Sequence, residues 1–233
     1  MVHLIKDIGL FYGAGDSFFK GIEKQAHSMT VNKGQVLFSR GEEAESLYFI
    51  KSGWIKLFRE TLDGTQSVID ILTSGHTFGE AAIFENHTYP YSAEVVESAE
   101  IISIPLGALK KEMEENHTLA LNMLKSMARY RRHQDQEIEH LSIQNAPQRI
   151  GCFLLRLVKQ DSQGPITIHL PYDKVLVASR LGMQPETFSR ALAKLKDKTG
   201  IKVKGATIEI DSIDQLVGYS CAACSSEFPC RDL

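Results

Sequence analysis

The residues between Gln184 and Lys198 combine hydrogen-bonding and basic side chains at helical spacing. Phe188, Leu192 and Leu195 fall at i, i+4 and i+7, so they share one buried face of a predicted helix over Pro185–Lys198. A helix of this kind fits the major groove, where Arg donates twice to guanine, Glu accepts from cytosine and Lys neutralises phosphate. The predicted contacts with double-stranded DNA on the opposite face are Gln184, Glu186, Thr187, Ser189, Arg190 and Lys194.

The neighbouring segments give this helix the context of a winged helix-turn-helix. Asp173–Leu181 is predicted to form a first helix, and Gly182 lies in the tight turn between the two. Residues 201–210 are predicted to form a hairpin, which carries Lys202 and Lys204. Such a β-hairpin fits a wing that touches the DNA backbone. The helix pair taken alone has a second interpretation, an ordinary helical hairpin whose charged face is solvated.

A long helix is predicted upstream of this region, from His117 to about Asn145, and Pro147 either ends it or starts a new helix. Side chains with a 4-3-4-3-4-3 spacing form a coiled-coil seam along it, interrupted by two polar residues. The seam consists of Ala120, Leu124, Met127, Arg131, Gln134, Ile138 and Leu141. The stripe either packs on its own domain or forms a homodimer through Leu124, Met127, Ile138 and Leu141, and we favour the homodimer.

The front of the chain reads as short strands. Residues 28–105 contain β-branched and aromatic runs punctuated by Ser52-Gly53, Asp63-Gly64 and Ser74-Gly75, which is typical of an antiparallel barrel or double-sheet roll. A helix is predicted before the roll, over Phe18–His27, and another after it, over Leu106–Glu115. The fold class is therefore α+β: an N-terminal β-roll, a long dimerisation helix and a C-terminal winged helix-turn-helix.

Composition and charge divide the 233 residues in the same way. The content of 43% hydrophobic and 24% charged residues is that of a globular protein, and no run of eighteen apolar residues predicts a membrane span. Residues 1–116 carry 10 basic and 17 acidic side chains, whereas residues 147–217 carry 11 and 7. We predict a sensor domain over 1–116, a dimerisation helix over 117–146, a DNA-binding domain over 147–217 and a tail over 218–233. The N-terminus lacks the pattern of a secretory signal, so a cytoplasmic protein is expected.

The tail contains a cluster of three cysteines, Cys221, Cys224 and Cys230, with the spacing C-x2-C-x5-C. Thiolates spaced in this way can hold zinc or most of an iron–sulfur cluster, although the fourth ligand is not evident unless the fold brings Cys152 close. A reversible disulfide acting as a redox switch is a second interpretation. Incidental thiols in a tail without function are the third.

The order of these elements resembles the superfamily of the cyclic-AMP receptor protein and the fumarate–nitrate regulator, over residues 28–215. The motifs that carry the resemblance are Gly79-Glu80-Ala81-Ala82-Ile83-Phe84, the long helix and Gln184-Pro185-Glu186-Thr187-Phe188-Ser189-Arg190. The resemblance implies a cyclic-nucleotide-binding-like roll, a homodimer and RNA polymerase as a partner. It also implies that Glu186, Ser189 and Arg190 read a TTGAT-like half-site, which a two-fold dimer would meet twice as an inverted repeat.

The resemblance places a candidate effector pocket at Gly79, Glu80, Tyr91 and Ser92. In the family an arginine precedes the Ser-Ala pair of the phosphate site, and here Tyr91 stands at that position. A phenol is neutral near pH 7 and cannot replace a bidentate guanidinium, which argues against cyclic-AMP binding.

The effector therefore remains open. The chain resembles most the denitrification-type branch, which is proposed to sense nitric oxide through haem, and haem or a metal or iron–sulfur centre is a candidate cofactor. A cyclic-nucleotide-responsive module and a thiol or metal redox sensor that uses the C-terminal cysteines are the alternatives. The sequence contains no Ser/His/Asp constellation, no H-E-x-x-H and no Walker-type loop, so an enzyme is not expected.

Overall fold

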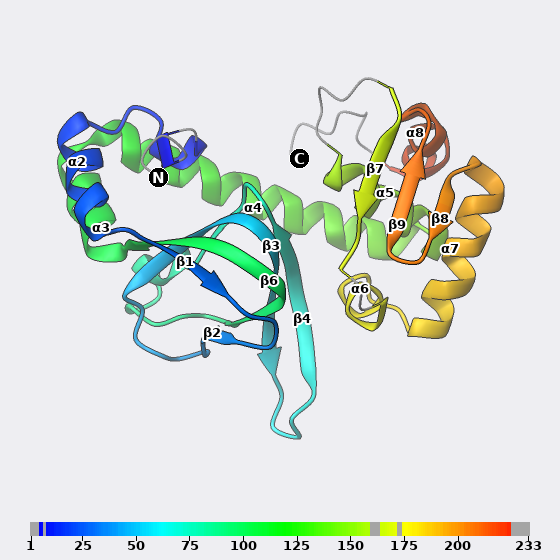
Figure 1. The fold of residues 1–233 in the computed structure, drawn as a ribbon, viewed down its shortest axis with the longest axis horizontal. Coiled ribbons are helices and arrows are strands. Elements are labelled where there is room, and N and C mark those ends of the chain that lie inside the picture. The colour runs from blue at the N-terminus through cyan, green and yellow to red at the C-terminus, as the bar shows by residue number, and fades with distance from the viewer. Residues whose placement is uncertain (1–4, 7, 159–163, 172–173, 225–233) are drawn as a thin grey trace. The chain divides into compact units, whose positions relative to one another are not determined.

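The computed structural model describes residues 5–6, 8–158, 164–171 and 174–224 (Figure 1). The chain divides into two compact units, and the division falls between Ala128 and Arg129. Each unit has its own hydrophobic core. The α+β fold class predicted from the sequence is confirmed.

The first unit is a roll of six antiparallel strands. The strands are β1 (His27–Val31), β2 (Val36–Phe38), β3 (Ser46–Glu60), β4 (Gln66–Thr73), β5 (Thr77–Phe78) and β6 (Ser92–Pro105). They are ordered β1-β6-β3-β4, with β2 added on β6 and β5 on β3. The short helix η2 (Glu80–Phe84) follows β5, where the sequence places the effector pocket.

Strand β3 corrects the prediction of a turn at Ser52-Gly53. The two predicted runs on either side form one strand of fifteen residues, in which the register against β6 shifts at this point. Gly53 has φ +90°, and a Cβ there would lie 2.5 Å from the carbonyl oxygen of Ser98. The glycine thus allows a bulge and a close backbone approach within a continuous strand.

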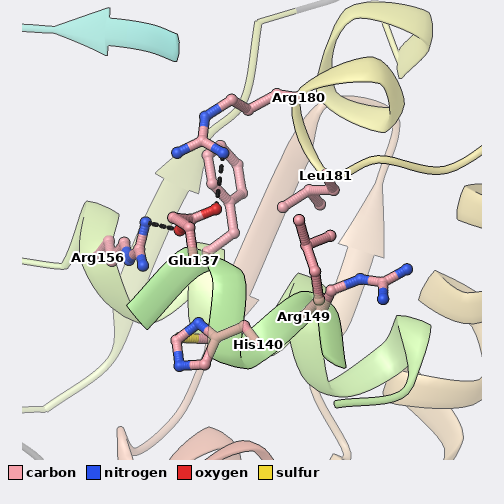
Figure 2. Close-up of a pocket in the computed structure, with 9 residues that line it drawn as sticks. Glu137, His140, Arg149, Arg156, Arg180 and Leu181 are labelled. Atoms are coloured by element: carbon pink, nitrogen blue, oxygen red, sulfur yellow. Dashed lines mark hydrogen bonds and ion pairs between the residues drawn. The ribbon is translucent and has the colours of Figure 1, made fainter. Parts of the chain in front are cut away.

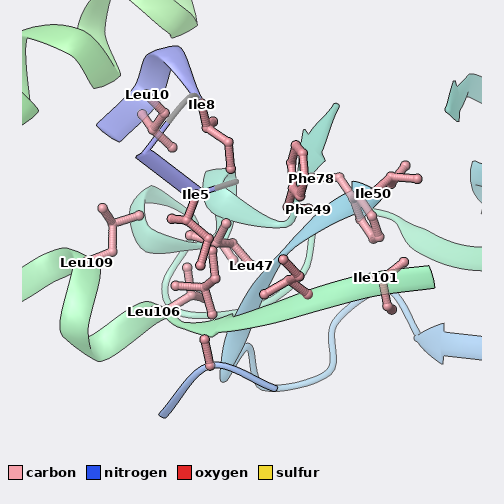
Figure 3. Close-up of a cluster of buried hydrophobic side chains, with 14 of the residues drawn as sticks. Ile5, Ile8, Leu10, Leu47, Phe49, Ile50, Phe78, Ile101, Leu106 and Leu109 are labelled. Carbon is pink, nitrogen blue, oxygen red and sulfur yellow. The ribbon is translucent and has the colours of Figure 1, made fainter. Parts of the chain in front are cut away.

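Helices cover one end of the roll. The segment before β1 forms η1 (Gly9–Phe11) and α2 (Asp16–Gln25), so the predicted helix ends before His27, which starts β1. After β6, α3 occupies Leu106–Glu115 as predicted. Figure 3 shows Ile5, Ile8 and Leu10 packed in the same cluster as Leu109.

Helix α4 (His117–Ile143) runs through the division between the units. It starts in the core of the roll, where Leu119 and Met123 are buried. It ends before Asn145, which caps α5 (Ala146–Leu157) through a reciprocal pair of hydrogen bonds with Gln148. Of the two interpretations of Pro147, the start of a new helix is therefore correct.

The second unit has the elements of a winged helix-turn-helix. After α5 come β7 (Ile166–His169), α6 (Lys174–Arg180), α7 (Pro185–Thr199), β8 (Lys202–Lys204) and β9 (Thr207–Ile210). The strands form a three-stranded sheet with the order β7-β9-β8, so β7 extends the predicted hairpin. The unit continues through α8 (Asp214–Ser220) and η3 (Cys221–Ala223), which were not predicted.

Candidate DNA interface and sensor site

Helix α7 is fixed in rotation by its buried face. Phe188, Leu192 and Leu195 belong to the core of the second unit, together with Val177 of α6. Gln184 precedes the helix with an extended backbone, and Gly200 ends it with φ +75°. Because the apolar face is anchored, the other face of α7 must lie at the surface.

The six predicted DNA contacts of α7 lie on or beside that exposed face. Five of them are exposed, namely Gln184, Glu186, Ser189, Arg190 and Lys194, and Thr187 is half-buried. Glu186 and Arg190 are four residues apart and Ser189 lies between them, so all three can reach one line of base edges.

The wing carries its two lysines on the exposed strand β8. The Nζ of Lys202 lies 3.1 Å from a carboxylate oxygen of Asp211, and the Nζ of Lys204 lies 3.2 Å from one of Glu209. Exposed ion pairs of this kind are worth about 0–1 kcal/mol, so a phosphate can replace the carboxylate at little cost.

Helix α4 presents the predicted seam to solvent in the single chain. The exposed fractions of Leu124, Met127, Ile138 and Leu141 lie between 47% and 63%, and Leu121 is also 54% exposed. A stripe of large apolar side chains at this spacing marks an interaction surface.

A partly buried ion cluster in the second unit joins three helices, and sequence reasoning missed it. The carboxylate of Glu137 on α4 pairs with the guanidinium of Arg156 on α5, and its Oε2 lies 2.8 Å from Nη1 of Arg180 on α6 (Figure 2). Burial by itself raises the pKa of Glu137, but the charges of Arg180 and Arg156 outweigh it and lower the pKa to about 2. Because Arg180 belongs to the first helix of the helix-turn-helix, the cluster holds that motif to the end of α4.

We expect Glu137→Gln to destabilise the second unit by about 2–3 kcal/mol at pH 7, because it leaves two largely buried guanidinium groups without their carboxylate. Since the folded-state pKa lies below the ordinary 4.5, this stabilisation is present above pH 4.5 and is lost as the pH falls towards 2. Hydrogen exchange of the α5 amides measures the change. Asp135→Asn removes an exposed ion pair on the same helix and should cost under about 1 kcal/mol; an equal cost for both variants would contradict the role of the cluster.

In the roll, two of the four predicted effector-pocket residues, Gly79 and Tyr91, contact each other beside the start of η2, and Glu80 and Ser92 are their neighbours in the chain. The backbone N–H of Gly79 donates to the hydroxyl of Tyr91 at 3.1 Å, and the hydroxyl of Ser92 accepts from the N–H of Arg40 at 2.9 Å. Gly79 has φ +91°, and a Cβ there would lie 3.2 Å from the carbonyl oxygen of Ser46. Two groups that a bound phosphate could use are therefore hydrogen-bonded within the chain.

Aromatic side chains pack beside this site. The ring of Phe38 stacks on that of Tyr89 with centroids 3.6 Å apart, and the centroids of Tyr48, Phe78 and Tyr91 lie within 6.0 Å of it. Sequence spacing does not predict that these rings meet, because they come from three strands, β2, β3 and β5, and from the loop before β6.

Glu80 is the acidic residue of the site. Its Oε2 is buried and has no hydrogen-bond partner within the described residues. Burial raises the pKa of Glu80 to about 7, because the charged form loses its hydration.

The raised pKa of Glu80 predicts a pH-dependent stability of the roll. Because the folded form keeps its proton above the ordinary 4.5, the free energy of unfolding should fall as the pH rises from 4.5 through about 7. Glu80→Gln should remove this slope and stabilise the roll by about 1–3 kcal/mol at pH 8. The single tryptophan, Trp54 in β3, reports unfolding of the roll by fluorescence. Glu85→Gln, at an exposed position just after η2, is the control; a slope that survives in Glu80→Gln would contradict the assignment.

The structure describes two of the three tail cysteines. Cys221 lies in η3 and packs against the second core, and Cys224 follows it, whereas Cys230 lies outside the described residues. Cys152 is brought close, as its Sγ lies 3.8 Å from Nδ1 of His140, whose Nε2 lies 3.4 Å from Sγ of Cys224. Within the described residues, no three His, Cys, Asp or Glu side chains are grouped so that they could hold a metal ion.

Comparisons with known proteins agree with this architecture. A family model of the cyclic nucleotide-binding domain matches residues 28–116, and one of the Crp-like helix-turn-helix domain matches residues 148–219. The fumarate and nitrate reduction regulatory protein of Escherichia coli K12 is 30% identical over 196 residues, which are 82% of this chain and 78% of that protein.

Solved structures extend the similarity. A putative cyclic nucleotide binding protein from Ruegeria pomeroyi is 33% identical, with a TM-score of 0.72, over 94% of this chain and 97% of that one. DNR from Pseudomonas aeruginosa is 28% identical, with a TM-score of 0.52, over 92% and 95% of the two chains.

The fold and the exposed helix α7 define a DNA-binding transcription regulator with a cyclic-nucleotide-binding-like sensing domain. The chain belongs to the Crp/Fnr family of transcription regulators. Its relatives are regulators rather than enzymes, which confirms that prediction. None of the helices in the described ranges is long and apolar enough to cross a bilayer.

Proposed function

We propose that this regulator binds a TTGAT-like inverted repeat as a homodimer and places α7 of each chain in the major groove. The observation that carries the proposal is the exposed line of Glu186, Ser189 and Arg190 on a helix whose other face is anchored by Phe188. Arg pairs best with guanine and Glu accepts from cytosine, so this face selects a sequence. The residues Gln184, Thr187, Lys194, Lys202 and Lys204 hold the helix and wing on the DNA by polar and phosphate contacts.

The homodimer of the proposal forms through α4. Leu124, Met127, Ile138 and Leu141 repeat at coiled-coil spacing and are exposed in the single chain. The same helix of a second copy covers them, and the two-fold axis of the dimer dictates the symmetry of the DNA site. As a transcription regulator, the dimer works in the cytoplasm with RNA polymerase.

Fluorescence anisotropy tests this function. A labelled duplex with two TTGAT-like half-sites about one helical turn apart is titrated with the reduced protein at fixed salt, because phosphate contacts make every affinity salt-dependent. We expect it to bind at least about 10³-fold more tightly than a scrambled duplex of the same composition. Equal affinity for the two duplexes would refute the proposal.

The effector in this proposal is nitric oxide or the redox state rather than cyclic AMP. Tyr91 stands where a phosphate-binding arginine would be needed, and its hydroxyl holds the N–H of Gly79. A cyclic-nucleotide-responsive module is the competing interpretation, and the match of residues 28–116 to that domain is its support.

No histidine described in the roll or at the start of α4 is placed as a buried axial ligand for haem. A haem iron needs a buried axial ligand in an apolar cleft, yet His27, His76, His87 and His117 are all exposed. The buried histidine is His140, and it contacts two thiols in the second unit. This arrangement favours thiol chemistry as the route by which the protein responds to redox state.

A further inference from the structure

We propose that Cys224 is a reactive thiol, that His140 accepts its proton, that Cys152 orients His140, and that hydroperoxides are its oxidants. The inference rests on the proposed function in that it names the site of redox response. It assigns that response to the DNA-binding unit instead of the roll.

The geometry has the form of a nucleophile, a base and an orienting group. Nε2 of His140 lies 3.4 Å from Sγ of Cys224, and Nδ1 of the same ring lies 3.8 Å from Sγ of Cys152. Both distances suit hydrogen bonds that involve sulfur. One imidazole thus contacts two thiols that lie 84 and 12 residues away in the sequence, and the same three-part arrangement activates nucleophiles in enzymes.

The imidazole of His140 is held in its neutral form, which the proton transfer needs. Burial, and next the charge of Arg156, lower the pKa of His140, so the imidazole is neutral near pH 7 and one ring nitrogen is an acceptor. We assign the tautomer in which Nδ1–H donates to Cys152, which leaves the lone pair of Nε2 for the thiol proton of Cys224.

Close packing of α5 on α8 brings the three groups together. A Cβ on Gly151 would lie 1.9 Å from the hydroxyl oxygen of Ser220, which is fully buried. Only glycine at position 151 allows this approach, and Cys152 is its neighbour in the chain. The same packing sets η3, and Cys224 after it, beside the end of α4.

The thiols of Cys152 and Cys224 differ in their exposure to solvent. Cys152 is 8% exposed and lies in the interior, whereas Cys224 is partly exposed at the end of η3. Oxidation of cysteines follows exposure and thiolate character. A small oxidant can therefore reach Cys224 first, while Cys152 keeps its positioning role.

The step proceeds with hydrogen peroxide as the oxidant. The sulfur of Cys224 attacks one peroxide oxygen, so that an S–O bond forms as the O–O bond breaks. The thiol proton passes to Nε2 of His140 and then to the leaving hydroxide, which becomes water. The sulfur loses two electrons and becomes a sulfenic acid, and the peroxide is reduced.

Dimedone trapping on the full-length reduced protein tests the proposal. The protein is treated with limiting hydrogen peroxide at pH 7, and the labelled cysteines are identified by peptide mass spectrometry over time. We expect Cys224 to be labelled at least about tenfold faster than Cys152, and His140→Gln to slow the labelling of Cys224 at least about tenfold. His169→Gln, which changes an exposed histidine on β7, should leave the rate unchanged.

Variants of the orienting residue distinguish positioning from general packing. Cys152→Ser keeps an acceptor for Nδ1–H and should retain most of the Cys224 rate, whereas Cys152→Ala should lose several-fold. Equal rates at Cys224 and Cys152, or an unchanged Cys224 rate in His140→Gln, would overturn the proposal. The labelling involves no DNA, so a failure of duplex recognition refutes the proposed function and leaves this result standing.

Discussion

Arg190→Ala should weaken binding to the inverted repeat by about 2–6 kcal/mol, because each chain of a dimer loses one contact worth about 1–3 kcal/mol. The guanidinium lies on the exposed face of α7, four residues from Glu186, and can donate twice to one guanine. Gel-shift titration at fixed salt measures the loss. Arg190→Ala should also relax the preference at the base pair that Arg190 reads.

Arg190→Lys is the matched control for this prediction. It keeps the positive charge for phosphates but loses the bidentate fork. We therefore expect it to lose sequence preference while it retains the salt dependence of the wild type. If Arg190→Ala binds the repeat and a scrambled duplex as the wild type does, α7 is not the reading helix.

The second large effect concerns the seam of α4. Leu124→Glu combined with Ile138→Glu would place like charges opposite each other in a two-fold pair of helices, and the dimer should separate. Because two linked modules bind about 10²–10⁴-fold more tightly than one, affinity for the inverted repeat should fall by that factor. Analytical ultracentrifugation and anisotropy measure the two consequences.

Leu62→Glu is the control for the seam. Leu62 is fully exposed in the turn between β3 and β4 and lies outside α4, so its change should alter neither mass nor affinity. If the double variant of the seam still sediments as a dimer, the seam does not mediate dimerisation.

Local patterns predicted much of the fold. The 3.6-residue period of α7 places Phe188, Leu192 and Leu195 on one face, and the structure buries all three. The bounds of α3 were predicted to the residue, and α4 was predicted to within a turn. The apolar periodicity of these helices is a local signal, so the sequence alone was enough to predict them.

Features that depend on tertiary contact could not be predicted in the same way. The turn predicted at Ser52-Gly53 is a bulge in β3, because a glycine at a close backbone approach has the same local signature as a turn glycine. The pairing of Glu137 with Arg156 and Arg180 joins residues 19 and 43 apart along the chain, so spacing gives no sign of it.

The chemistry of the candidate sites was predicted unevenly for the same reason. Tyr91 was identified by its place before Ser92, and the structure adds that its hydroxyl occupies the N–H of Gly79. The contact of Cys224 with His140 depends on how α8 returns to α4 and α5, which no local pattern encodes.

Selection of binding sites from a random duplex library tests the central claim most directly. The wild-type protein is used to enrich 30-base-pair duplexes, and the enriched pool is sequenced. The account predicts an inverted repeat with TTGAT-like half-sites whose centres lie about 10 base pairs apart, and a weaker preference at one position of each half-site with Arg190→Ala. Enrichment of a single half-site, of a direct repeat or of no motif would contradict it.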